Sequence, residues 1–181
     1  MRKLIAILLL ALTPLSYGGK QIIGVATFTR PADTTTYTSG DLVANSVTAG
    51  SVVPLAFSIA PTGGSGKITR VRVFTSSTSV TLAQFRVHFY KFSPVPANGD
   101  NGVWLTPHSG YMGSFDVTVD KVFSDGAKGV GFATTGVGTD VRFDAGTGNN
   151  IIYALIEARA AYVPTSAEVF IVDVECEQSP Y

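Results

Sequence analysis

Short runs of alternating apolar and polar residues dominate the chain from residue 20 onward. In QFRVHFYKF two sets of side chains alternate, with Phe85, Val87 and Phe89 in one and Arg86, His88 and Tyr90 in the other. Successive side chains of a β-strand point to opposite faces, so the first set is predicted to face the core and the second to face outward. Comparable runs predict nine strands, at residues 22–29, 52–59, 67–75, 84–92, 113–119, 129–134, 139–144, 150–158 and 168–175.

The breaks between these strands carry turn residues, as in PTGGSG at 61–66 and PVPANGDNG at 94–102. Glycine supplies positive φ angles there, and Asn or Asp supports local turns. Neither a helix nor an internal repeat is predicted. We therefore expect one all-β domain over residues 20–181, a β-sandwich of jelly-roll type with eight or nine antiparallel strands.

Two strands carry further expectations about their faces. The run IIYALI at 151–156 is almost continuously apolar, which predicts a strand covered on both sides, by the second sheet and by another subunit. In KITRVRVF, Arg70 and Arg72 alternate with apolar residues and predict a partly basic outer face. The single cysteine, Cys176, excludes an internal disulfide and is interpreted as a small apolar residue near a strand end.

Residues 1–19 form a separate hydrophobic segment. Arg2 and Lys3 precede the apolar run LIAILLLAL, and small residues follow it, with Ser16 and Gly18 placed for cleavage after Gly18. This order is that of a secretory signal, and the run is too short to span a bilayer, which needs about 20 residues. The alternative is a retained hydrophobic arm that binds another protein. A signal peptide would bring the chain to a membrane only transiently.

Composition narrows the class of function. Charged residues make up 14% of the chain, with 13 basic and 13 acidic side chains. A nucleic-acid-binding domain usually shows a basic surplus or stripe, so no nucleic-acid partner is expected. Charged residues are few while Gly, Thr, Ser and Val are abundant, and this composition is typical of an all-β domain.

Three motifs resemble phosphate-binding or metal-binding sites, but each is better interpreted as a turn, a strand or a surface residue. GGSGKIT at 63–69 has Ile68 where a phosphate-binding loop needs Ser or Thr, and it leads into a strand. His88 and His108 lack metal-ligand spacing and are predicted to be surface histidines. The segment from Asn98 to Asn101 lacks the later ligands of a calcium loop and is predicted to be a turn. We expect no enzymatic activity, no cofactor and no metal.

Five segments carry a resemblance to a known family: ATFTRPADTTTYTSGDLVANS, GSVVPLAFSIA, SVTLAQFRVHFYKFSPVPANGDNGVW, GSFDVTVDKVFSDGA and IIYALIEARAAYVPTSAEVFIV. In order and spacing they resemble small proteins encoded beside the capsid genes of tailed bacteriophages and prophages. The resemblance covers roughly residues 24 to 175. It implies a capsid decoration, or cement, protein: a compact β-sandwich on the outside of an icosahedral head. Its implied partners are the major capsid protein and further copies of itself, in a trimer rather than a dimer.

Candidate contact residues lie in loops. The Thr-rich segment 30–45 lacks a core pattern and is predicted to face the capsid, which makes Arg30, Asp33, Tyr37 and Asp41 candidates. Exposed aromatic residues are also predicted in or beside loops, namely Tyr37, Trp104, Tyr111, Tyr162 and Tyr181. In an alternative interpretation, Trp104 and Tyr111 do not bind a partner but cap one end of the sandwich. The alternative function is an exported β-sandwich, secreted or periplasmic, that binds a carbohydrate or another ligand through these aromatics.

Overall fold

The computed structural model describes residues 20–178 except 60–63, 80–81, 133–140 and 147. Within these residues it has one 3₁₀ turn, η1 (Ala49–Ser51), and no α-helix. Ten strands are present in the described residues: β1 (Gln21–Thr29), β2 (Leu42–Val43), β3 (Leu55–Ser58), β4 (Ser65–Thr75), β5 (Gln84–Tyr90), β6 (Tyr111–Phe123), β7 (Gly126–Phe132), β8 (Val141–Asp144), β9 (Ile151–Ala158) and β10 (Val169–Gln178). All nine predicted strands are found, and the two-residue β2 was missed.

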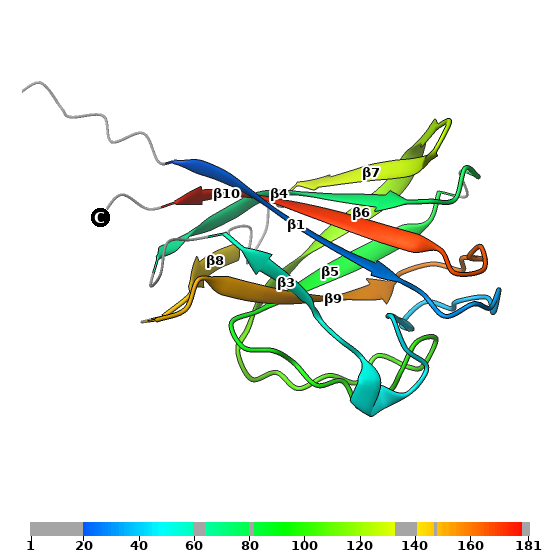
Figure 1. Cartoon of the computed structure of the whole chain (residues 1–181), viewed down its shortest axis with the longest axis horizontal. Coiled ribbons are helices and arrows are strands. Elements are labelled where there is room, and N and C mark those ends of the chain that lie inside the picture. Colours follow the sequence, from blue (N-terminus) through cyan, green and yellow to red (C-terminus); the bar gives the residue numbers. More distant parts are fainter. Residues whose placement is uncertain (1–19, 60–63, 80–81, 133–140, 147, 179–181) are drawn as a thin grey trace, which may run out of the picture.

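The strands form two facing sheets joined by β6 (Figure 1). The first sheet has the order β1-β10-β4-β7, with β8 also paired to β4, and the second has the order β3-β9-β5-β6, with β2 also paired to β9. The first part of β6 pairs with β5 and its last part pairs with β7, so the hydrogen-bonded path curls from one sheet into the other. All pairings are antiparallel, and the strand order is that of a jelly roll, so the predicted fold class is confirmed.

The core lies between the two sheets. Phe85, Val87 and Phe89 are fully buried, which confirms the inward set predicted from the alternation in β5. The Phe85 ring makes edge contacts with Phe170 at 5.4 Å and Tyr162 at 5.5 Å between ring centroids. Each such side chain contributes about 1.5 to 3 kcal/mol through burial.

The outer face of the second sheet is covered by the chain itself. His88 and Tyr90 point to that face as predicted, but both are buried, because Trp104 and Thr106 of the segment 91–110 contact them there. The prediction that His88 is a surface histidine is therefore wrong, whereas His108 is exposed. Leu155 of IIYALI packs with Leu42 and Trp104. At Leu155 its second face is thus covered by other parts of the same chain, whereas Ile151 and Tyr153 on that face are half-buried, and contact of this strand with another subunit stays a prediction.

The outer face of the first sheet is electrically balanced. Arg70 and Arg72 point outward, but both contact the Glu175 carboxylate, at 3.4 and 2.7 Å. The predicted basic face is therefore wrong, because the neighbouring strand β10 supplies the opposite charge. Cys176, on the inward side of β10, is buried as predicted, and burial raises the pKa of its thiol to about 12.

Some predictions fall outside the described residues. These are the hydrophobic segment 1–19, Tyr181 and the strand ends at 133–134 and 139–140. In the described part of the chain, no helix is long and apolar enough to cross a membrane.

Candidate contact surface

A buried polar cluster fastens the Thr-rich segment to the segment around Asp100. Arg30 donates from Nη2 to Asp100 Oδ2 at 2.9 Å and from Nε to the Tyr37 hydroxyl. Tyr37 donates to Asp100 Oδ1 at 2.7 Å, and the Ala44 amide donates to the same oxygen at 2.7 Å. Burial raises the pKa of the Asp100 carboxyl, against the lowering effect of these hydrogen bonds and of the Arg30 charge. The cluster holds residues 30–44 in one conformation.

This cluster changes the predicted contact set. The side chains of Arg30 and Tyr37 are fully buried, and Asp41 is buried beside Thr38, whose hydroxyl donates to it at 2.9 Å. These three side chains are not exposed as predicted, because their polar groups are used within the fold; that the segment faces the capsid stays a prediction. Only Asp33 of the four keeps a substantially exposed side chain, at 36%.

Of the aromatic residues predicted to be exposed, some are buried in the structure and others are at least partly exposed. Tyr37 and Tyr162 are buried and stacked at 6.2 Å, so their predicted exposure is wrong. Trp104 is half-buried, and its ring stacks on His88 at 4.1 Å. It therefore covers a sheet face, which also corrects the end-cap interpretation. Tyr111 is 44% exposed and stays available to a partner.

His88 contacts side chains of β9 and β6 and stacks beneath Trp104 of the segment 91–110. Its Nε2 lies 2.9 Å from Glu157 Oε2, and its Nδ1 lies 3.4 Å from the Tyr111 hydroxyl. Burial lowers the pKa of His88, and Glu157 opposes this effect, while Arg86 and Arg159 add to it. The folded protein thus favours the neutral imidazole.

We expect a pH dependence of stability from His88. A histidine whose pKa is lower in the folded than in the unfolded state makes folding less favourable as pH falls through its unfolded pKa of about 6.5, by up to about 1.4 kcal/mol per pH unit until the folded pKa is reached. Chemical unfolding between about pH 7.5 and 5.5 should show this loss, which H88Q should reduce. The exposed His108 provides the control H108Q. Parallel pH profiles for wild type and H88Q would contradict the assignment.

Two adjoining loops carry a concentration of exposed apolar side chains. The segments 40–47 and 99–104 are joined by backbone hydrogen bonds, including Leu42 N to Gly102 O at 2.8 Å and Asp100 N to Ser46 O at 2.7 Å. The η1 turn and the long segment after β5 lie on the same side of the sandwich (Figure 1). We define the loop surface by the apolar side chains of the wider segments 44–54 and 92–110 that are more than 60% exposed: Val47, Val53, Val95, Val103 and Leu105.

The loop surface is almost free of charge. Residues 42–66 contain no Asp, Glu, Lys or Arg, and residues 92–115 contain only Asp100, which is buried against Arg30. Charge depletion with exposed apolar residues is typical of the centre of a protein–protein interface. These two stretches, poor in charged residues, are the sequence signal that could have identified the surface.

A second apolar area lies on the outer face of the first sheet. Its exposed members are Ile23, Val25, Val130, Phe132 and Ile171. They alternate with the Arg70, Arg72 and Glu175 ion pairs. This face therefore mixes apolar and charged contacts, in contrast to the loop surface.

These features define a jelly-roll sandwich with an exposed apolar surface that carries almost no charge. Among the described residues, no group of three or more His, Cys, Asp and Glu is placed to hold a metal ion. No family model and no curated protein matches the sequence.

Two solved structures are similar over much of this chain. A chain titled cyanophage Pam1 capsid asymmetric unit is 14% identical over 94% of this chain and 93% of that one, with a TM-score of 0.32. A xylanase 10B of Clostridium thermocellum, with CBM22-1 and GH10 modules complexed with xylohexaose, is 11% identical over 87% of this chain and 26% of that one, with a TM-score of 0.27. Identities and TM-scores this low do not support any conclusion about function.

Proposed function

We propose that this protein is a structural virion protein that decorates and stabilises an icosahedral phage head. It binds the outer surface where major capsid proteins meet. The loop surface is the observation that carries the proposal, because five large apolar side chains there are exposed without a charged residue among them. The resemblance of residues 24 to 175 to phage cement proteins supports it. No cofactor and no catalysis are needed.

The mechanism is one of contact area and mass action. An interface of about 800 Å² per partner is enough for stable attachment. A protein that binds only the assembled shell stabilises that shell according to its concentration and affinity. The buried Arg30–Asp100 pair would help by holding the two loops in one shape before binding, which lowers the ordering cost of association.

Binding to heads tests the proposal. Heads purified without the protein should bind the wild-type chain on sedimentation, and V103D should weaken that binding by about tenfold or more, because it buries a charge in the interface. Val163 is exposed at 59% but lies outside the loop surface, so V163D is the matched control. Failure of the wild-type chain to sediment with heads, or equal losses in both variants, would refute the proposed function.

We further propose that copies of the chain associate through the outer face of the first sheet. The resemblance implies a trimer rather than a dimer. Phe132 is 58% exposed at one side of this face, and a charge there should disfavour burial against another copy. Light scattering should therefore show a trimer for the wild type and V163E, and a monomer for F132E. A monomeric wild type would contradict this contact.

Among the described aromatics, the carbohydrate alternative keeps only Tyr111, which is 44% exposed, and the half-buried Trp104. One face of the Trp104 ring is already occupied by His88, and Tyr37 and Tyr162 are buried. Mass spectrometry of the mature N-terminus and of purified particles separates the alternatives. A chain cleaved after Gly18, found in the secreted fraction and absent from particles, would favour the exported binding module.

A further inference from the structure

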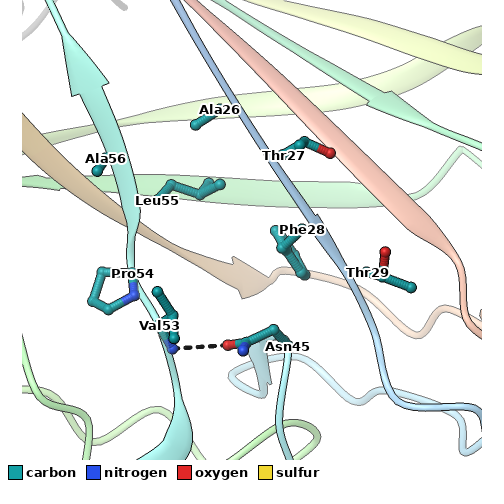
Figure 2. A pocket seen from close by; sticks show the side chains of 9 residues that line it. All are labelled: Ala26, Thr27, Phe28, Thr29, Asn45, Val53, Pro54, Leu55 and Ala56. Atoms are coloured by element: carbon teal, nitrogen blue, oxygen red, sulfur yellow. Dashed lines mark hydrogen bonds between the residues drawn. The ribbon is translucent and has the colours of Figure 1, made fainter.

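A groove of about 580 Å³ lies between the edge strands β1 and β3 (Figure 2). Its wall on the β1 side is formed by residues 26–29 and its wall on the β3 side by residues 53–56, with Asn45 at the mouth. The two strands belong to different sheets, so the groove runs along an open side of the sandwich.

Both walls are strands with a free edge. In the described part of the chain, β1 is hydrogen-bonded only to β10, and β3 only to β9. The edge of a sheet exposes unpaired N–H and C=O groups, which can pair with an added strand. The strands come close at Gly24, where a Cβ atom would lie 2.6 Å from Ile59 Cγ2. They diverge toward Thr29 and Val53, which opens the groove at that end (Figure 2).

The uncharged, partly apolar lining of the groove indicates which kind of segment could bind in it. None of the nine lining residues is charged, and Phe28 and Leu55 present apolar side chains from its two walls (Figure 2). An extended segment with uncharged, mainly apolar side chains fits such a site, because its backbone can pair with a strand edge while its side chains meet this lining.

The groove is continuous with the loop surface. Val53 belongs to both, and its amide donates to Asn45 Oδ1 at 2.8 Å across the groove mouth. A partner bound on the loop surface therefore reaches the open end directly. The start of β1 is at the other end, where Lys20 O accepts from Gln178 N at 3.0 Å. The N-terminal segment of the same chain would have to turn back at that end to reach the groove, whereas a partner on the loop surface meets the open end without such a turn.

We propose that an extended, uncharged segment of the major capsid protein inserts into this groove and pairs with the free edge of β1 or β3. The inference rests on the proposed function and adds a second, main-chain contact to it. Loop-surface contacts position the partner, and the inserted segment closes the open side of the sandwich.

Hydrogen exchange of the full chain, free and bound to heads, tests the insertion. We expect the amides of residues 26–29, 55 and 56 to exchange at least about tenfold more slowly on the head, because they become hydrogen-bonded or covered. Pro54 has no amide hydrogen, and the Val53 amide is already bonded to Asn45. Protection confined to the loop surface would overturn the insertion and leave the proposed function standing. Absence of binding to heads would overturn both. A third outcome would also overturn the insertion: the edge amides are protected from exchange in the free chain, and deletion of residues 1–19 removes that protection. The groove would then be filled by the chain's own N-terminal segment.

A pair of variants on β3 provides an independent test. Ala56 and Ser58 are both exposed on the same side of the strand, but only Ala56 lines the groove. We expect A56K to weaken binding to heads by about tenfold and S58K to change it by less than about threefold. Circular dichroism should show both variants folded. Equal affinities for the two variants would count against insertion.

Discussion

Replacing Asp100 by alanine is expected to lower the free energy of unfolding by about 3 to 5 kcal/mol, the cost of breaking a buried ion pair. The side chains of Asp100 and Arg30 are both fully buried. The variant D100A leaves the Arg30 guanidinium without its buried carboxylate partner and removes the acceptor of the Tyr37 hydroxyl and the Ala44 amide. Equilibrium unfolding in urea measures the change.

The matched control is D33A. Asp33 also contacts Arg30, but at 3.4 Å and with a side chain that is 36% exposed. Water screens such a pair, so its loss should cost no more than about 1 kcal/mol. Similar losses for D33A and D100A would show that the buried pair does not hold the two loops together. Weaker head binding by D100A under conditions where it stays folded would link the cluster to the proposed contact.

Local pattern was sufficient to predict most of the fold. The alternation in QFRVHFYKF identified Phe85, Val87 and Phe89 as core residues, because a period of two is a property of any half-buried strand. β2 was missed because Leu42 and Val43 form too short a run to show a period, and they become a strand only by pairing with β9. The predicted end of β6 at residue 119 was early, because its last residues cross to a different sheet.

The contact residues were predicted less well because they depend on long-range contacts. Arg30 and Asp100 are polar residues in turn-like segments, which predicts exposure, but they meet in the core across 70 positions of sequence. His88 was placed on the correct face of β5, yet a later segment covers that face. Polarity alone does not distinguish a solvated side chain from one whose partners lie far away in the chain.

The passage of β6 between the sheets explains why β7 has glycines on its inward side. Gly129 and Gly131 are buried, whereas the alternate residues Val130 and Phe132 are exposed. A Cβ atom at Gly129 would lie 2.2 Å from the Thr118 carbonyl oxygen, and one at Gly131 would lie 2.6 Å from the Asp116 carbonyl oxygen. Glycine weakens a strand, so its presence here is explained by the close approach of the β6 backbone.

We therefore expect G129V to destabilise the protein by about 3 kcal/mol or more, at the upper end of the range for overpacking. The clash is with backbone atoms, so relief requires β6 to separate from β7 at the point where the two sheets join. Thermal and urea unfolding measure the loss, with G129A as a smaller change that keeps the test informative if G129V fails to fold. The neighbouring V130A, on the exposed side, should cost less than about 1 kcal/mol. Wild-type stability in G129A would mean that β6 can move away from β7 at little cost, and that the junction between the sheets is looser than its packing indicates.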